Sequence, residues 1–188
     1  MSSLATAPPL ATTLVLGGAR SGKSRHAETL VRESGLQRFY LATAAIGDGE
    51  MADRIASHRQ DRGPDWVTIE EEFDLAGTLV REARPGRAIL VDCLTLWLSN
   101  LMLADRDIPA ASAELCGLLP SLPCPVVLVS NEVGMGLVPE TPLGRRFRDA
   151  QGRLNQAVAA AVPSVVFVAA GLALTLKQAG QSGARSFA

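Results

Sequence analysis

The residues best suited to chemistry in the 188-residue sequence stand together in one glycine-rich stretch. Positions 17–24 read G-G-A-R-S-G-K-S, which satisfies the pattern G-x-x-x-x-G-K-[ST] at every fixed position. Glycines let successive backbone N–H groups converge on phosphate oxygens, and a helix that follows adds its positive N-terminal end. We therefore predict a phosphate-binding loop made of Gly17, Gly18, Ala19, Arg20, Ser21, Gly22, Lys23 and Ser24.

Two positions of this loop and one further carboxylate predict a magnesium nucleotide site. Lys23 can reach the β- and γ-phosphates of a nucleoside triphosphate, and the Ser24 hydroxyl can coordinate Mg²⁺. Asp92 follows the apolar residues AILV and can steady the metal from a neighbouring strand. The alternative interpretation of residues 17–24 is a glycine-rich turn with a solvated lysine. The alternative for Asp92 is an ordinary aspartate that ends a strand.

The elements that must position these residues follow an alternating pattern. Apolar, β-branched runs predict five strands, and their lack of polar alternation is typical of a parallel sheet covered on both faces by helices. Helical spacing follows the glycine-rich loop at 24–34, and an apolar stripe of Phe147, Ala150, Leu154, Val158 and Ala161 predicts a helix over 145–162. We predict an α/β fold of the P-loop NTPase, RecA-like type, with a mostly parallel sheet flanked by helices. The predicted strands are 12–17, 38–43, 88–94, 125–133 and 164–171.

Composition narrows the class of protein. The 47% apolar content fits one domain, which we place at 13–178 between a flexible leader at 1–12 and a disordered tail at 179–188. The net charge of −1 gives no basic field for nucleic acid, and no apolar run is long enough for a membrane span. Three cysteines without metal-ligand spacing indicate buried thiols in a reducing compartment, so we expect a cytoplasmic protein.

The sequence has two histidines. His26 follows the glycine-rich loop directly and is more typical of a helix-surface or packing residue than of a catalyst. His58 stands among Arg54, Arg59 and Arg62, where guanidiniums attract phosphate. A neutral imidazole there could attack phosphorus, although a solvated basic helix would carry the same residues.

Three segments together resemble a known enzyme family. LVLGGARSGKSRHAE, YLATAAIGDGEMADRIASHRQDRG and VSNEVGMGLVPETPLGRRFRDAQGRLNQ are similar to the bifunctional adenosylcobinamide kinase/adenosylcobinamide-phosphate guanylyltransferase family of cobalamin biosynthesis. The likeness runs from about residue 14 to 177, and the third segment is far more specific than the glycine-rich loop. By itself, that third segment predicts a strand, a glycine-rich loop and a helix, whose residues could pack or contact substrate.

The resemblance implies a role for individual residues. Positions 17–24 would bind nucleoside triphosphate, and His58 would become covalently guanylylated. The remaining positions that match the family's nucleotide contacts are Ala42, Thr43, Ala44, Arg59, Gln60, Asp61, Arg62, Glu70 and Asp92. The implied substrates are ATP or GTP, adenosylcobinamide and its phosphate, with Mg²⁺ as cofactor and a homotrimer as the assembly.

Two other functions use the same loop. A P-loop small-molecule kinase without the guanylyl step would not need His58. A nucleotide-dependent switch would bind and slowly hydrolyse GTP without an acceptor. The sequence leaves open whether ATP or GTP is the preferred phosphoryl donor.

Overall fold

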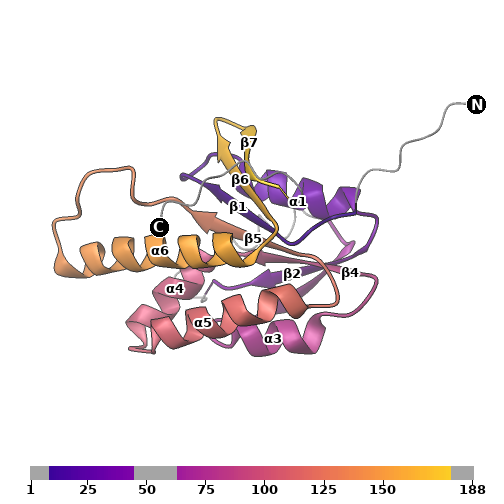
Figure 1. Cartoon of the computed structure of the whole chain (residues 1–188), viewed down its shortest axis with the longest axis horizontal. Helices are drawn as coiled ribbons and strands as arrows, with labels where there is room; N and C mark the ends of the chain where they lie inside the picture. The colour runs from indigo at the N-terminus through magenta and orange to yellow at the C-terminus, as the bar shows by residue number, and fades with distance from the viewer. Residues whose placement is uncertain (1–8, 45–62, 179–188) are drawn as a thin grey trace, which may run out of the picture.

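The computed structural model describes residues 9–44 and 63–178 and contains one seven-stranded sheet within them (Figure 1). The strand order is β3-β2-β4-β5-β1-β6-β7, and all neighbours are parallel except β6 and β7. The predicted mostly parallel α/β fold is therefore confirmed. The strands are β1 (Thr13–Gly17), β2 (Gln37–Ala42), β3 (Trp66–Glu70), β4 (Arg87–Asp92), β5 (Val126–Asn131), β6 (Ser164–Ala169) and β7 (Leu172–Lys177).

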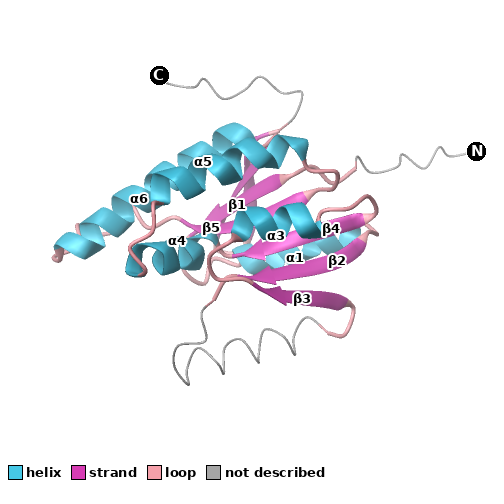
Figure 2. Ribbon diagram, turned by 90° about the horizontal axis from the view of Figure 1, so that it is seen from below, coloured by secondary structure: helices cyan, strands magenta, loops and turns pink. Residues whose placement is uncertain are grey.

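Helices cover both faces of the sheet unequally. Helix α1 packs on one face with a core cluster of its own, whereas α3 to α6 share the larger core of the other face. Figure 2 shows this division, with α3 to α6 in front of the strands and α1 behind them. The helices within the described residues are α1 (Lys23–Glu33), α3 (Leu75–Glu82), α4 (Leu94–Leu103), α5 (Ile108–Leu118) and α6 (Pro142–Ala161), with a 3₁₀ turn η1 (Leu119–Ser121).

All five predicted strands are present, and both predicted helices are too. Helix α6 begins three residues earlier than predicted because the Thr141 hydroxyl accepts a hydrogen bond from the backbone N–H of Gly144 at 3.1 Å. The predicted stripe of α6 faces the core, with Ala150, Leu154 and Val158 buried. Strands β3 and β7 were not predicted, and both lie at edges of the sheet, where half-exposed residues weaken the apolar pattern.

Backbone register brings the predicted functional positions to one edge of the sheet. Asp92 ends β4 and pairs with Ala42, which in turn pairs with Glu70 at the end of β3. On the other side of β4, the end of β1 pairs with the end of β5 through Gly17 and Asn131. Parallel strands present their carboxyl ends at a common edge, which is where ligands bind in open α/β sheets. No helix in the described ranges is both long and apolar enough to cross a bilayer.

Candidate nucleotide site

The glycine-rich loop joins β1 to α1 and is held in a shape that few sequences adopt. Gly22 has φ of 95° and occupies the N-cap position of α1, and Arg20 has φ of 55°. The left-handed conformation at Gly22 favours glycine, and the space there is tight as well, because a Cβ atom would lie 3.2 Å from the Gly171 Cα. No side chain caps this helix end, so the first N–H groups of α1 remain suited to an anion.

Contacts from neighbouring strands hold the loop in place. The Gly171 N–H, in the turn between β6 and β7, donates to the Ser21 carbonyl at 2.8 Å. The Glu132 N–H, just after β5, donates to the Gly17 carbonyl at 3.1 Å. Lys23 is the first residue of α1, and its Nζ donates to the Gly18 carbonyl at 3.2 Å. The ammonium group thus already lies over the loop that would hold the phosphates.

The paired glycines at the start of the loop have different structural demands. A Cβ atom on Gly17 would lie 2.5 Å from both the Ser21 Oγ and the Val168 carbonyl oxygen, whereas one on Gly18 would meet no atom within 4 Å. We expect Gly17→Ala to lower the free energy of unfolding by about 2 kcal/mol, the usual cost of forcing atoms into a packed site. Gly18→Ala is the matched control and should change it by less than about 0.5 kcal/mol. Urea unfolding of both variants measures the difference, and equal stabilities would contradict the close packing around Gly17.

Asp92 lies at the carboxyl edge with a fixed orientation. The Tyr40 hydroxyl donates to Asp92 Oδ2 at 3.0 Å, and the aspartate side chain is only partly buried. Ser24, in the first turn of α1, offers a hydroxyl from the start of that helix. Both side chains provide the hard oxygen donors that Mg²⁺ prefers, and the described residues contain no cluster of three or more metal-binding side chains. A hydroxyl and a carboxylate are ligand types that Mg²⁺ uses together with nucleotide phosphates.

The predicted nucleotide contacts at positions 42–44 differ in burial and in hydrogen bonding. Thr43 is fully buried, and its hydroxyl donates to the Cys93 carbonyl at 2.7 Å and accepts from the Cys93 N–H at 2.8 Å. Its carbonyl accepts from Asn100 Nδ2 at 2.8 Å. Thr43 therefore joins the end of β2 to the start of α4, and Ala44, which is partly buried, follows it at the edge.

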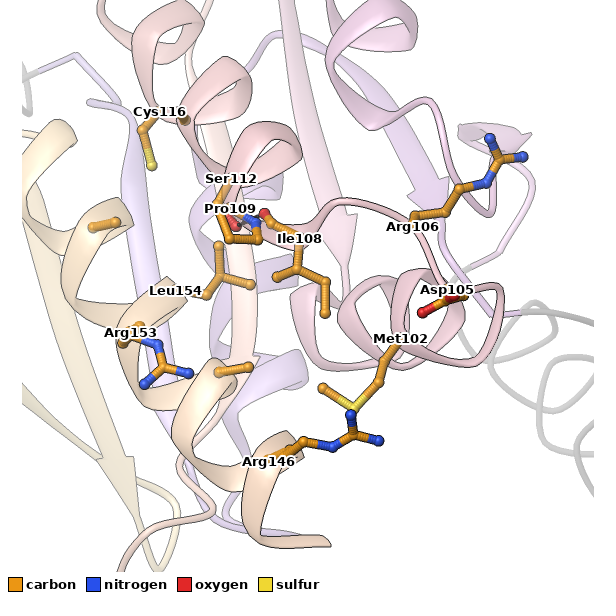
Figure 3. Close-up of a pocket in the computed structure, with 13 residues that line it drawn as sticks. Met102, Asp105, Arg106, Ile108, Pro109, Ser112, Cys116, Arg146, Arg153 and Leu154 are labelled. Carbon is orange, nitrogen blue, oxygen red and sulfur yellow. Dashed lines mark hydrogen bonds between the residues drawn. The ribbon is translucent and has the colours of Figure 1, made fainter. Parts of the chain in front are cut away.

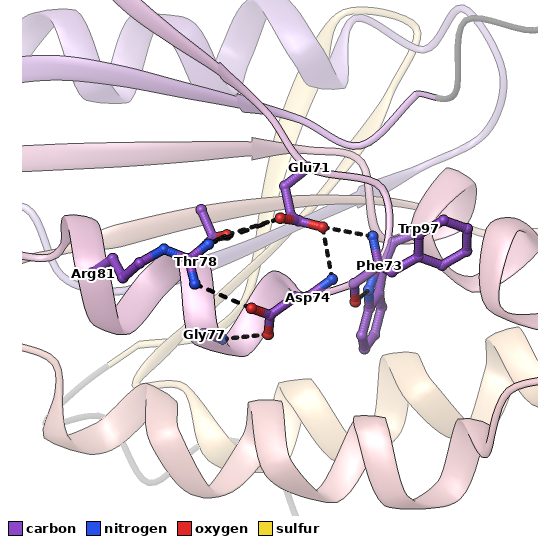
Figure 4. A network of polar contacts seen from close by, with 7 residues as sticks. All are labelled: Glu71, Phe73, Asp74, Gly77, Thr78, Arg81 and Trp97. Carbon is purple, nitrogen blue, oxygen red and sulfur yellow. Dashed lines mark hydrogen bonds and ion pairs between the residues drawn. The ribbon is translucent and has the colours of Figure 1, made fainter.

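Glu70 and Glu71 have different surroundings at the end of β3. Glu70 is exposed at the carboxyl edge. Figure 4 shows that Glu71 instead organises the turn into α3, where its Oε1 accepts from the N–H groups of Phe73 and Asp74 at 2.9 and 2.8 Å. Asp74 caps α3 by accepting from the Gly77 N–H at 3.0 Å. Glu71 is thus committed to this turn, whereas the Glu70 side chain is exposed at the end of β3.

A buried polar cluster fixes the end of β5, which sequence patterns did not predict. Gln151 and Asn155 interrupt the apolar face of α6, and Gln151 Nε2 donates to the Ser130 Oγ at 2.9 Å. The Ser130 hydroxyl donates to Asn155 Oδ1 at 2.6 Å, while Asn155 Nδ2 donates to the Asn131 carbonyl at 3.1 Å. The loop that begins at Glu132 therefore starts beside Gly17. Two polar residues on an apolar helical stripe were the available signal for this cluster.

The rest of this loop and the start of α6 carry exposed apolar groups and arginines. Met135, Leu137 and Val138 are exposed. Arg145 donates to the Pro139 and Glu140 carbonyls at 3.0 and 2.7 Å. The guanidinium of Arg148 pairs with Asp149 at 2.9 Å. Arg145 and Arg148 are thus engaged within the protein, whereas Arg146, which lies between them in the sequence, is exposed.

The structure describes one of the two histidines, His26, and all three cysteines. His26 lies on α1 and is partly buried, as predicted; burial lowers the pKa of its imidazole, and the Glu33 carboxylate opposes that shift. His58 and the predicted nucleotide contacts Arg59, Gln60, Asp61 and Arg62 lie outside the described residues. All cysteines are free thiols, and Cys93 and Cys124 are buried, but Cys116 is only half-buried.

The chain matches one protein family along most of its length. The family model described as cobinamide kinase / cobinamide phosphate guanyltransferase matches residues 13–176. The bifunctional adenosylcobalamin biosynthesis protein CobP of Pseudomonas aeruginosa is 52% identical over 166 residues, covering 87% of this chain and 96% of that protein. The bifunctional adenosylcobalamin biosynthesis protein CobU of Escherichia coli K12 is 43% identical over 179 residues, covering 87% and 98%.

Solved structures with far lower identity share the fold. The flagellar accessory protein FlaH of Methanocaldococcus jannaschii superimposes with a TM-score of 0.51 at 13% identity, covering 92% of this chain and 80% of that one. The P4 protein of bacteriophage phi6, solved in complex with ADP, gives a TM-score of 0.50 at 16% identity over 96% and 61%. These similarities bear on the fold alone and agree with the P-loop NTPase architecture.

Proposed function

This chain belongs to the cobinamide kinase / cobinamide phosphate guanyltransferase family, and on that premise we propose that it catalyses both reactions. It would phosphorylate adenosylcobinamide with ATP or GTP and then transfer GMP from GTP to the resulting phosphate, giving adenosyl-GDP-cobinamide. The observation that carries the proposal is the glycine-rich loop at the carboxyl edge of a parallel sheet, in a chain 52% identical to a bifunctional relative.

The phosphoryl transfer would use groups of the loop and its helix. The uncapped N–H groups at the start of α1 would hold the phosphates, and Lys23 would turn from the Gly18 carbonyl to the β- and γ-phosphates. The aminopropanol hydroxyl oxygen of adenosylcobinamide would form a bond to the γ-phosphorus as the bond to the β–γ bridging oxygen breaks. The hydroxyl proton would pass to solvent, and a nucleoside diphosphate would be released.

Ser24 and Asp92 would hold Mg²⁺ at this site. When bound, the ion would neutralise phosphate charge and polarise the phosphoryl oxygens. The Tyr40 hydroxyl keeps the Asp92 carboxylate at the sheet edge, since it donates to Oδ2 and leaves the other carboxylate oxygen for the ion or its waters.

The guanylyl transfer would proceed by two displacements at phosphorus. His58 would attack the α-phosphorus of GTP, so that a P–N bond forms and pyrophosphate leaves. The phosphate of adenosylcobinamide phosphate would then attack the same phosphorus and break the P–N bond, which cleaves readily once the ring nitrogen is protonated. Arg59 to Arg62 would help to hold GTP, and Ala42 to Ala44 and Glu70 would contact nucleotide from the edge of the sheet. These roles follow the family resemblance of the sequence around His58.

The decisive experiment is a turnover assay with and without the corrinoid acceptor. We expect consumption of ATP or GTP to depend on adenosylcobinamide, with mass spectrometry detecting first the phosphate and then the GDP derivative. GTP hydrolysis that is indifferent to the corrinoid would instead support a nucleotide-dependent switch. Phosphorylation without the second product would support a kinase that lacks the guanylyl step. We expect these reactions to take place in the cytoplasm.

We also propose a homotrimer, which exposed apolar residues at the edge of the sheet support. Leu172 and Leu174 of β7 are 76% and 61% exposed, more than an isolated edge strand usually leaves in water. Light scattering after gel filtration should give the mass of three chains, and Leu174→Glu should reduce it to one. Thr175→Glu, on the opposite side of β7, is the matched control and should remain trimeric. A monomeric wild-type protein would contradict the assembly.

A further inference from the structure

A second pocket lies among α4, α5 and α6, away from the glycine-rich loop. Its volume is about 500 Å³, and it is lined by the end of α4, the turn that follows it, α5 from Ile108 to Cys116 and α6 from Arg146 to Ala157 (Figure 3). Most of its lining is apolar, including Met102, Ile108 and Leu154. No residue of the glycine-rich loop contributes, because α1 covers the opposite face of the sheet. The pocket is therefore separate from the glycine-rich loop.

The charged residues that line this pocket differ in where their side chains point. Arg146 and Arg153 stand seven residues apart on α6, so both face the same side of the helix. In Figure 3, Arg146 extends towards Met102 and Arg153 lies beside Leu154, whereas Arg106 points away from the pocket. Arg106 instead stands over the ring of Phe73 at 5.7 Å. Among the described residues of the lining, Asp105 carries the one carboxylate.

The two arginines of α6 are also available for a ligand. Within the described ranges, neither Arg146 nor Arg153 has a hydrogen-bond or ion-pair partner. The neighbouring Arg145 bonds two backbone carbonyls, and Arg148 pairs with Asp149. A guanidinium fits phosphate and carboxylate oxygens in a bidentate geometry, and it binds them more tightly beside apolar surface than in open water. An apolar floor with guanidiniums on one side selects a ligand that is apolar at one end and anionic at the other.

We propose that this pocket binds an amphipathic organic anion, with its hydrocarbon or aromatic body among α4, α5 and α6 and its oxyanion on Arg146 and Arg153. A phosphate monoester and a carboxylate share this chemistry. The inference does not depend on the proposed function, because the pocket and the glycine-rich loop have no residue in common.

Calorimetric titration of the full chain with n-octyl phosphate, octanoate and 1-octanol, each below its aggregation concentration, tests the proposal. We expect octyl phosphate to bind at one site per chain, and 1-octanol, which lacks the anion, to bind about tenfold more weakly or worse. Comparing octanoate with octyl phosphate identifies the preferred oxyanion. Saturating GTP should leave the affinity unchanged, since displacement by GTP would place the ligand at the glycine-rich loop and overturn the proposal.

Variants of α6 assign the site. Arg146→Gln and Arg153→Gln should each weaken octyl phosphate binding about tenfold. Arg148→Gln is the matched control, because that guanidinium pairs with Asp149 and does not line the pocket, and it should bind as the wild type does. Ala157→Phe should fill the pocket and abolish binding, with circular dichroism confirming that the variant is folded. An equal effect of Arg148→Gln, or no effect of Ala157→Phe, would reject the site.

Cys116 provides an independent readout inside the pocket. It is half-buried and lines this pocket, whereas Cys93 and Cys124 are buried. Alkylation by N-ethylmaleimide, followed by peptide mass spectrometry, should modify Cys116 first in the folded protein. Octyl phosphate should slow that reaction at least about fivefold in the wild type and in Arg148→Gln but not in Ala157→Phe. Alkylation of the wild type that octyl phosphate does not slow would overturn the proposal. Calorimetry that detects no binding would overturn it as well, and that is the result expected if a second copy of the chain covers the pocket.

Discussion

Replacing Lys23 with alanine should reduce both the phosphorylation and the guanylyl transfer at least about 100-fold, because the proposed phosphate site uses one ammonium group for both reactions. Lys23 is the first residue of α1, so its backbone is fixed at the positive end of the helix, and its Nζ already lies 3.2 Å from the Gly18 carbonyl of the loop. No other lysine lies near the loop in the sequence. A loss of this size corresponds to about 3 kcal/mol of transition-state stabilisation.

The second lysine of the sequence, Lys177, is a matched control for this experiment. Its Nζ caps the end of α6 by donating to the carbonyls of Ala159 and Val162 at 2.9 and 2.7 Å. Lys177→Ala should lower the free energy of unfolding by about 1–2 kcal/mol and leave the rates per folded molecule nearly unchanged. Steady-state rates and nucleotide affinity, measured with urea unfolding, separate the two roles. A Lys23→Ala enzyme that retained a tenth of either rate would contradict a shared phosphate site.

Replacing His58 with alanine should abolish guanylyl transfer and leave phosphorylation within about twofold of the wild type, since only the second reaction needs a covalent nucleophile. Incubation with GTP labelled on the α-phosphate should leave label on the wild-type protein. A bond between phosphorus and a histidine nitrogen survives alkali and breaks in acid, so the label should follow that pattern. It should be absent from His58→Ala.

The other histidine of the sequence is the control. His26 is partly buried on α1, where burial lowers the pKa of its imidazole. His26→Ala should retain the covalent label and both activities after correction for folded protein. Label that persists in His58→Ala, or equal loss of both reactions in that variant, would show that the two steps are not divided as proposed.

The sequence by itself determined the α/β architecture and the unit of strand, glycine-rich loop and helix, because both depend on short-range patterns. Apolar runs of five or six residues correspond to buried central strands, and the spacing of Ala150, Leu154 and Val158 places one face of α6 in the core. The glycine-rich motif is local for the same reason, since β1, the loop and α1 are consecutive.

Family resemblance added what local patterns could not supply. The names of the relatives and the family model confirm that the chain belongs to a kinase and guanyltransferase family. The role of His58 stays a prediction, because its position lies outside the described residues.

Only the tertiary structure decided which distant residues share the site. Tyr40 and Asp92 are 52 positions apart, and their hydrogen bond depends on the register of β2 against β4. The same register joins Thr43 to Cys93. No periodicity within one segment specifies its neighbour in a sheet, because strand order results from the packing of the whole chain.

The pocket beside α6 and the polar cluster beneath the loop arise in the same way. In the sequence, Gln151 and Asn155 are two polar residues in an otherwise apolar stripe. In the fold, both form hydrogen bonds with Ser130 of β5, which accounts for their polarity. The sequence does not distinguish Arg146 from Arg145 and Arg148. In the fold, Arg146 lines the pocket beside α4 and α5, whereas the other two are bonded to the Pro139 carbonyl and to Asp149. Burial and pairing of a side chain depend on its spatial neighbours, so the sequence supplied these residues and the folded chain determined what each can bind.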